Sequence, residues 1–443
     1  MGKGAIDIHN FDRRLERAEY SVKACNPISP KNAELISSFE EACTAQGLSK
    51  ARIAKYIQTT RKLAEWLGKD LDKANKADLQ KLVGGIERQD YSAWTKKDYR
   101  ITLKRFYSWL RETGEEYPDE VKWIKTTMRE KDILLPDEVV TEEEVKRIVD
   151  GADSPRDRAF IMTLYESGAR IGEVGSMRIR DASFEERYAR VMLKGKKGSR
   201  RVIVPASAPY LSAWIQGHPL RNDPDAPLWV NMGTVNRHQA MSYPALAKVL
   251  RVACRRAGIK KRVNPHKLRH SRATFMASKV TEANMNEIFG WRQGSRMPSI
   301  YVHLSGRDVD DALLGVYGLR KNAEEKPQLS PRVCPRCEVA NAYDGKFCSR
   351  CGLALDVKAA QELDAFPAGM SREQLIAQNI ELTAKVRELT EAMARVEKGY
   401  VKVSGQVTRV SGQVTRMSAE LAELKGKGAS TSGESVKRPG KTA

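Results

Sequence analysis

The chain has 443 residues, with 77 Lys and Arg against 56 Asp and Glu and a formal net charge of +21 at pH 7. This length exceeds what one compact core accommodates, so we expect several domains, and the positive charge indicates a polyanionic partner. Apolar runs fall short of the roughly 20 residues of a membrane span, and acidic residues interrupt the N-terminal stretch that a secretory signal would need. These features disfavour membrane and secreted proteins, and we expect an intracellular one.

The N-terminal part of the chain divides into three segments. Residues 1–29 are polar and are interpreted as an arm, and residues 117–135 as a linker. Between them, residues 30–116 carry apolar side chains at helical spacing, separated by glycines, which predicts a helical domain. The apolar positions are Leu35, Phe39 and Cys43, then Ile53, Ile57, Leu63 and Leu67, and then Ile101, Leu103, Phe106 and Leu110.

The next segment, residues 136–320, combines helical and strand signals. Thr141-Glu-Glu-Glu144 predicts a capped helix start. Apolar residues alternate on both sides of the basic run at 194–201, which predicts a β-hairpin with that run at its turn. Residues 251–272 carry nine Lys or Arg and no Asp or Glu. This basic stretch runs into His266 and Arg269, two side chains that can bind phosphate. Together they indicate the backbone of a nucleic acid as the partner.

Six residues in this segment form the most specific pattern of the chain. They are Arg170 in Ser-Gly-Ala-Arg-Ile-Gly-Glu, Lys194 in Leu-Lys-Gly, His266 and Arg269 in His-Lys-Leu-Arg-His, Trp291 after a glycine, and Tyr301 in Ser-Ile-Tyr-Val-His. In this order the set resembles the active site of the tyrosine recombinases, the phage integrase family, which breaks and rejoins DNA with a tyrosine nucleophile. The resemblance covers residues 136–320 by motif and residues 30–116 by pattern, and it implies a catalytic domain preceded by a helical core-binding domain.

The chemistry of phosphodiester cleavage explains this combination of residue types. Arg170 and Arg269 can hold the negative charge that develops on the phosphate with paired, fixed donors. The Tyr301 phenol, with an ordinary pKa of about 10, must lose a proton to attack, and His266 can accept it. Lys194 is the candidate acid for the leaving 5′-oxygen. A covalent phosphotyrosine keeps the energy of the broken bond, so neither ATP nor a catalytic metal is expected.

Some assignments around the site have alternatives. Lys196 and Lys197 follow Lys194 in the same basic run and are alternative general acids. Glu173 is expected to orient Arg170. Trp291 stands where the family has His or Trp, and because its indole is only a donor, His266 is the expected imidazole in the proton path.

Three further side chains near the motif are given other roles. His270 and His303 are interpreted as structural residues. Tyr317 is a possible rival nucleophile, but the spacing of Tyr301 from the Gly-Trp pair favours Tyr301.

Four cysteines form a second pattern. They fall as two Cys-x-x-Cys pairs ten residues apart, namely Cys334, Cys337, Cys348 and Cys351. In an intracellular chain this spacing predicts one structural Zn²⁺ held by four thiolates, because disulfides are disfavoured there. Residues 334–355 resemble a short zinc ribbon, whose folding energy metal would supply. The other cysteines have no such spacing and are expected to be plain thiols.

The C-terminal part carries a heptad pattern. Apolar residues recur at positions a and d from Leu375 to Leu424, which predicts a coiled coil over residues 371–425. One heptad is repeated in tandem at 403–416 and contains glycines that weaken a helix, so a non-helical repeat is a minor alternative. Residues 426–443 are rich in Gly, Ser and Lys and are predicted to be disordered.

These interpretations combine into one expectation. The fold is mainly α with a small β-sheet: a helical core-binding domain, a mixed α/β catalytic domain, a zinc ribbon and a long coiled-coil helix. The expected function is that of a site-specific DNA recombinase, an integrase of a mobile element, that acts on double-stranded DNA as a tetramer. We expect it in the cytoplasm of a prokaryote, at the nucleoid. A type IB topoisomerase-like nicking-closing enzyme and a catalytically dormant DNA-binding regulator are the alternatives.

Overall fold

A computed structural model describes residues 6–24, 28–114, 116–127, 139–195, 198–304 and 327–364, with scattered helical positions between 380 and 413. Lys196, Lys197 and Tyr317, most of the predicted coiled coil and the tail at 426–443 lie outside the described residues. The chain forms two compact units, Met1–Val357 and Lys358–Ala443. The structure is mainly helical with two small antiparallel sheets, as predicted.

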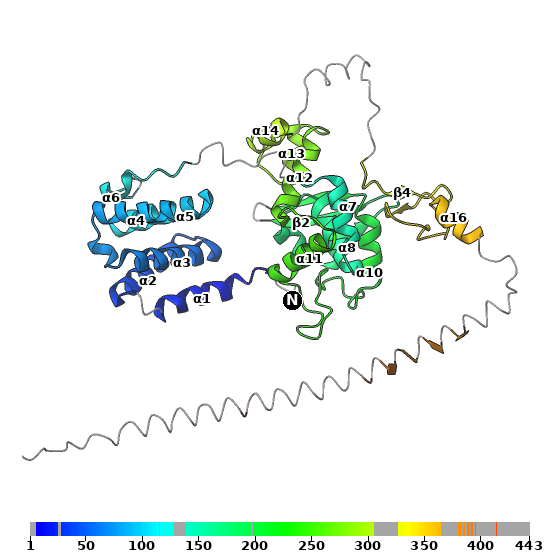
Figure 1. The fold of residues 1–443 in the computed structure, drawn as a ribbon, viewed down its shortest axis with the longest axis horizontal. Coiled ribbons are helices and arrows are strands. Elements are labelled where there is room, and N and C mark those ends of the chain that lie inside the picture. Colours follow the sequence, from blue (N-terminus) through cyan, green and yellow to red (C-terminus); the bar gives the residue numbers. More distant parts are fainter. Residues whose placement is uncertain are drawn as a thin grey trace, which may run out of the picture. The chain divides into compact units, whose positions relative to one another are not determined.

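The first domain is a helical bundle (Figure 1, blue to cyan). Its helices are α1 (Phe11–Lys23), α2 (Pro30–Ala45), α3 (Lys50–Leu67), α4 (Lys76–Arg88), α5 (Ala93–Leu110) and the short α6 (Asp119–Lys122). Local signals set their starts: the Ser29 hydroxyl accepts the Asn32 amide before α2, and Asn75 and Asp78 form a capping box at α4. Buried side chains such as Phe39 and Phe106 form its core.

The bundle begins earlier than predicted. The predicted arm at 1–29 contains α1, whose Ala18 and Val22 are buried in the bundle core. Phe11, Leu15, Ala18 and Val22 do recur at helical spacing, so a period was present, but the other residues of α1 are mostly charged or polar and the segment was interpreted from its polar composition. The predicted linker likewise starts with α6, whose Val121 is buried in the same core.

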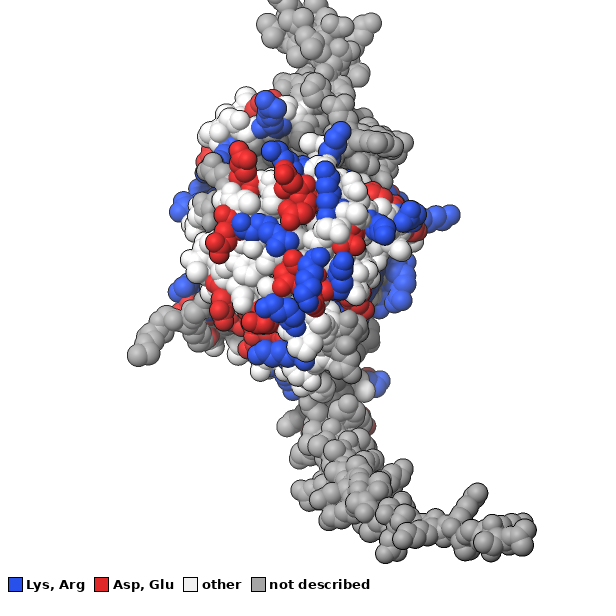
Figure 2. All heavy atoms as spheres, turned by 90° about the vertical axis from the view of Figure 1, so that its left-hand side faces the viewer, with Lys and Arg blue, Asp and Glu red and all other residues white. Residues whose placement is uncertain are grey.

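Charges of both signs are mixed on the bundle. Lys69 pairs with Asp78 at 2.8 Å, and Arg111 pairs with Glu120 at 3.1 Å. Figure 2 shows Lys and Arg interspersed with Asp and Glu on one face of the molecule. Exposed pairs of this kind add little stability, but they keep that face from becoming a continuous positive surface.

The second domain surrounds a three-stranded antiparallel sheet of order β1-β2-β3. Its elements are α7 (Glu142–Asp150), α8 (Pro155–Glu166), α9 (Ile171–Gly175), the 3-10 turn η4 (Ile179–Asp181), β1 (Ala182–Phe184), β2 (Ala189–Gly195), β3 (Gly198–Val204), α10 (Ala208–Gln216), α11 (Tyr243–Arg256), α12 (Pro265–Ala277), α13 (Glu282–Phe289) and α14 (Met297–Leu304). The capping box at Thr141 and the hairpin of β2 and β3 are both present as predicted.

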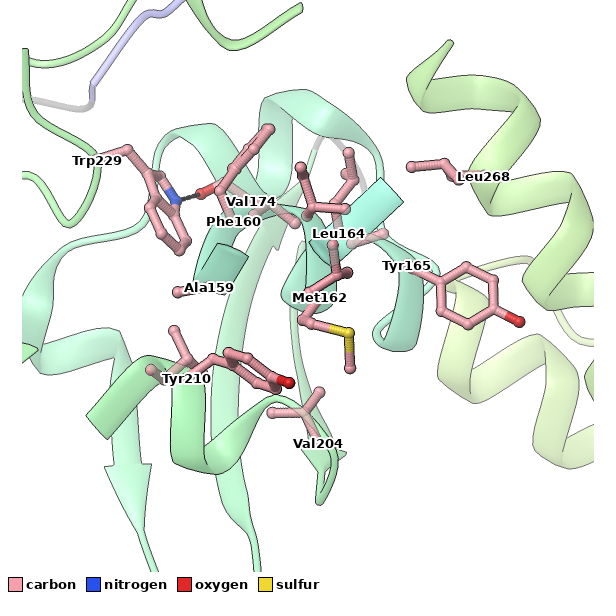
Figure 3. Close-up of a cluster of buried hydrophobic side chains, with 14 of the residues drawn as sticks. Ala159, Phe160, Met162, Leu164, Tyr165, Val174, Val204, Tyr210, Trp229 and Leu268 are labelled. Atoms are coloured by element: carbon pink, nitrogen blue, oxygen red, sulfur yellow. Dashed lines mark hydrogen bonds between the residues drawn. The ribbon is translucent and has the colours of Figure 1, made fainter. Parts of the chain in front are cut away.

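Helix α8 forms the centre of this domain. All its residues from Ala159 to Glu166 are buried, and they pack among side chains from several other elements (Figure 3). The buried Trp229 indole donates to the Val174 carbonyl at 2.7 Å, which joins the core to α9. The buried Glu166 carboxylate accepts the amides of Ala206 and Ser207 and so fixes the end of β3.

A small cysteine-rich module packs on the second domain. It contains the antiparallel pair β4 (Arg332–Val333) and β5 (Ala340–Asn341), and α16 (Val357–Asp364) follows it. Tyr343 is buried in the core of the second domain, and its hydroxyl donates to Asp150 at 2.9 Å. The Tyr210 hydroxyl of α10 donates in return to Asp344 at 2.6 Å. The module is therefore seated on the domain by its own side chains.

Among the described residues, no helix is long and apolar enough to cross a membrane.

Candidate active site

The buried guanidinium of Arg269 lies at the centre of the site. Helix α12 carries it, and it donates to the carbonyls of Gly168 and Phe289, each at 2.7 Å. The rings of Phe289 and Trp291 lie 5.3 and 5.5 Å from its carbon, which adds cation–π attraction. Burial, together with the nearby charge of Arg170, lowers the pKa of Arg269 to about 10, so it stays protonated at pH 7. Its remaining N–H groups can bind an anion.

Arg170 belongs to a network around one buried carboxylate. It is the N-cap residue of α9, half exposed, and its guanidinium donates to Glu173 at 3.1 Å. The other carboxylate oxygen of Glu173 accepts the Arg170 amide at 3.0 Å and the Arg200 guanidinium at 2.8 Å. Burial raises the pKa of Glu173, but the bonds and charges of Arg200 and Arg170 outweigh burial, and the net pKa is lowered. Glu173 is therefore an anion, and its carboxylate orients the Arg170 side chain.

Arg200 was not singled out in the sequence, although it is a central part of this network. It lies on β3 with a side chain 13% exposed, and its Nε also donates to the Ile288 carbonyl at 2.9 Å. A signal was present: Arg200 lies on the same strand face as Val202 and Val204, which are buried. Period-two alternation thus points Arg200 inward, unlike its neighbour Arg201.

Tyr301 is placed among aromatic side chains from two other elements. It is 3% exposed, and its ring stacks on Trp291 with centroids 5.5 Å apart and planes at 6°. Its hydroxyl forms a short hydrogen bond with Nδ1 of His270 on α12. Burial raises the pKa of Tyr301 to about 12, partly offset by the charge of Arg269. The phenol is therefore protonated at neutral pH and needs a proton acceptor to become a nucleophile.

His270, interpreted from sequence as structural, is the imidazole on the Tyr301 hydroxyl. Burial, with the nearby His266 and the charge of Arg269, lowers the pKa of His270 to about 4, so the ring is neutral and able to accept. His266, the acceptor expected from sequence, lies next to it with ring centroids 4.3 Å apart. Burial and the charges of Arg269 and Arg170 lower the pKa of His266 as well. Among the described contacts, only His270 bonds the tyrosine.

Lys194 lies at the edge of the arrangement. It is in β2, which packs against α9, and its side chain is half exposed. Its ammonium donates to the buried Asp181 at 3.0 Å, and the next residue, Gly195, lies against the Glu173 carboxylate. The structure thus brings together Arg170, His266, Arg269, Trp291 and Tyr301, whereas the described ion pair of Lys194 is with Asp181.

Comparisons with known proteins agree with this geometry. Residues 138–307 match the model of the phage integrase family. This part of the chain is a phage integrase domain.

Relatives of the integrase domain include a tyrosine recombinase of Thermosipho africanus, 29% identical over 60% of this chain and 93% of the relative. Tyrosine recombinase XerA of Pyrococcus horikoshii is 25% identical over 64% of this chain and 93% of the relative. A solved XerH recombinase bound to a palindromic difH substrate aligns with 70% of this chain and 97% of that chain, at 21% identity and a TM-score of 0.49. The family model confirms the expected family for residues 138–307.

Next to the integrase domain, the four predicted cysteines converge. The Sγ atoms of Cys334, Cys337, Cys348 and Cys351 all lie within 4.8 Å of one another. Two of their separations are 3.6 and 3.5 Å, close to the roughly 3.8 Å that a tetrahedron of Zn–S bonds of about 2.3 Å requires. The buried Asn341 braces the site, because its side-chain oxygen accepts the Ser349 amide at 2.8 Å while its amide donates to the Val339 carbonyl at 2.9 Å. The residues present fit a structural zinc ion.

We expect Arg200→Met to destabilise the integrase domain by about 3 kcal/mol, because it leaves the buried Glu173 without its main partner. Thermal or urea unfolding of the variant measures this. Arg201→Met is the matched control on the exposed face of the same strand and should change stability by less than about 0.5 kcal/mol. Equal effects of the two substitutions would contradict the role of Arg200.

Proposed function

We propose that this protein is a site-specific DNA recombinase that cuts and rejoins double-stranded DNA through a covalent 3′-phosphotyrosine. The observation that carries the proposal is the meeting of a tyrosine, a neutral histidine and a buried arginine in one site of a phage integrase domain. Tyr301 is bonded to His270, stacks on Trp291, and lies in the field of Arg269. This combination suits tyrosine attack on a phosphate.

In the proposed cleavage step, Arg269 and Arg170 bind the non-bridging oxygens of the scissile phosphate. The Tyr301 oxygen attacks phosphorus as its proton passes to His270, the bond from phosphorus to the 5′-oxygen breaks, and Lys194 protonates that leaving oxygen. Rejoining reverses these steps with a 5′-hydroxyl, so the phosphodiester count is unchanged and no nucleotide is consumed. Arriving negative charge also raises the pKa of His270, which makes it a better acceptor in the complex.

His266 is proposed to support this step from beside His270. His266 is only partly enclosed, so part of the residue reaches solvent, and its ring lies edge-on to His270. From there it can contact the phosphate or receive the proton from the site. Trp291 is proposed to keep the Tyr301 ring in place by stacking and to exclude water from one face of it.

The assembly and cellular setting follow from the same proposal. Recombination joins two duplexes, so we propose that the protein acts as a homo-tetramer on DNA and that the heptads at 371–425 add self-association. The described positions between 380 and 413 are helical, which supports a helix there. We propose that the protein acts at the nucleoid in the cytoplasm, as an integrase of a mobile element.

Tyr301→Phe tests the chemistry directly. The variant should bind DNA like the wild type, because it loses only a buried hydroxyl, but it should form no covalent adduct on a nicked suicide substrate. Denaturing gel electrophoresis of radiolabelled DNA measures the adduct. The control is Tyr20→Phe, a change at a tyrosine that is 72% exposed on α1, and it should keep full adduct formation. Adduct persisting in Tyr301→Phe would overturn the assignment of the nucleophile.

The pH dependence of cleavage tests the proton acceptor. An acceptor works only when deprotonated, and at limiting DNA the rate reports the free enzyme. Because the pKa of His270 is about 4, it is deprotonated from pH 8 down to pH 6, and activity should be lost only as the pH falls toward 4. Initial rates of adduct formation at subsaturating DNA should therefore be flat between pH 6 and 8. A tenfold fall through pH 6.5 would instead indicate an acceptor with an ordinary histidine pKa.

We further propose that the four cysteines hold one structural Zn²⁺ per chain. Zinc there would fold the module that seats Tyr343 in the integrase core, and it would contribute no ligand to the reacting phosphate.

Cys348→Ser should therefore lose zinc and lower the unfolding temperature of the integrase domain, while the folded protein still forms the phosphotyrosine. Native mass spectrometry and thermal unfolding give the two readouts, and Cys43→Ser, a buried cysteine of the bundle, is the control that should retain zinc. Full zinc content in Cys348→Ser would contradict the site.

A further inference from the structure

The segment at residues 6–11, which we call the N-terminal clip, packs on the integrase domain although the whole bundle separates the two in sequence. Ile8 is 4% exposed and belongs to the integrase core, and Ile6 packs against the same core. The Ile8 carbonyl accepts the amide of Tyr243 at the start of α11, at 2.7 Å. Through these contacts the N-terminal clip forms part of the integrase domain.

Residues within the N-terminal clip stabilise its conformation. The Asp7 carboxylate accepts the amides of His9 at 2.9 Å and Phe11 at 2.7 Å. Asn10 adopts a left-handed conformation with φ of 51°, which turns the chain into α1. The His9 ring lies 5.0 Å from the rings of both Phe11 and Tyr243 and stacks on each of them. The clip therefore presents Ile8 and His9 in a fixed arrangement.

These two side chains occupy a face of α9 that carries no side chains of its own. A Cβ at Gly175 would lie 2.7 Å from the Ile8 Cδ1, and a Cβ at Gly172 would lie 3.3 Å from the His9 Nε2. Both distances are closer than ordinary contact, so the glycines admit the clip. Each glycine also costs about 1 kcal/mol of helix stability, and a single turn does not hold on its own. Outside packing must hold α9, and the clip supplies part of it.

Arg170 is the N-cap residue of helix α9, and the helix carries Glu173, which bonds both Arg170 and Arg200. We infer that the N-terminal clip is a positioning element of the active site: Ile8 and His9 hold α9 so that Arg170 faces the scissile phosphate. This inference rests on the proposed recombinase function. Since α1 follows the clip directly and packs in the bundle, the clip also couples the bundle to the catalytic arginine.

Ile8→Ala in the full chain tests the inference with two readouts. Without DNA, hydrogen exchange of the amides at 171–176 should speed up at least tenfold, while exchange in α8 is unchanged. With saturating nicked DNA, the rate of adduct formation should fall about tenfold or more, because a displaced Arg170 no longer fits the transition state. DNA affinity should stay within about twofold of wild type. Ile8→Val, which keeps a branched side chain, should give wild-type exchange at 171–176 and a wild-type rate of adduct formation.

Leu15→Ala is the matched control for general loss of stability. Leu15 lies on α1 and packs against the bundle core rather than α9. This variant should lower the unfolding temperature but leave adduct formation at saturating DNA and exchange at 171–176 unchanged.

A second pair of variants keeps the test decisive if Ile8→Ala folds poorly. Gly175→Ala should slow adduct formation, because the new methyl would lie 2.7 Å from both the Ile8 Cδ1 and the Leu246 Cδ1. Combining it with Ile8→Ala removes the first of these two clashes, so the double variant should be faster than the product of the two single effects predicts. Strictly multiplicative effects, or wild-type exchange and adduct rates in Ile8→Ala, would overturn the inference. Absence of adduct in the wild type would instead refute the proposed function. Hydrogen exchange at 171–176, which needs no DNA, would then still test whether the clip holds α9.

Discussion

The arrangement of the active site depends on how the protein buries one positive charge. A guanidinium as enclosed as that of Arg269 is costly unless its donors are satisfied. Two backbone carbonyls, of Gly168 and Phe289, satisfy it. Gly168 belongs to the turn that leads into Arg170, and Phe289 ends the helix that leads into Trp291. One side chain thus ties together the segments that carry Arg170 and Trp291.

This constraint explains a close approach that allows no substitution. Gly168 has φ of 56°, and a Cβ there would lie 2.3 Å from the Phe289 ring. A side chain at 168 would push Phe289 away and break the bonds of both carbonyls to Arg269. Around this centre, Arg170 and Arg200 pair with one buried carboxylate, Glu173, whose negative charge also acts on Arg269. A phosphate would neutralise the surplus of positive charge. Burial, and after it this positive charge, lowers the pKa values of His266 and His270 in the free site.

The main groups were named from the sequence because the ordered set resembles the active site of the tyrosine recombinases, and phosphodiester chemistry explains why arginines, histidine and tyrosine occur together there. The hairpin, the capping box at Thr141 and the cysteine cluster also followed from local spacing. What local spacing could not reveal depends on distant contacts. His270 meets Tyr301 only because α12 and α14 pack together. Ile8 contacts α9 although the whole bundle lies between them in the sequence. Helix α1, in contrast, could have been predicted: its apolar residues recur at helical spacing, but its polar composition led to the interpretation as an arm.

The central claim is that Tyr301 attacks a DNA phosphate and becomes covalently linked to it. The most direct measurement traps the wild-type protein on a nicked suicide duplex, digests the adduct, and locates the nucleotide by tandem mass spectrometry. The account predicts one modified peptide, with a 3′-linked phosphate on Tyr301 and a free 5′-hydroxyl on the released strand. A phosphate on another residue, a 5′-linkage, or cleavage with no covalent protein would contradict it.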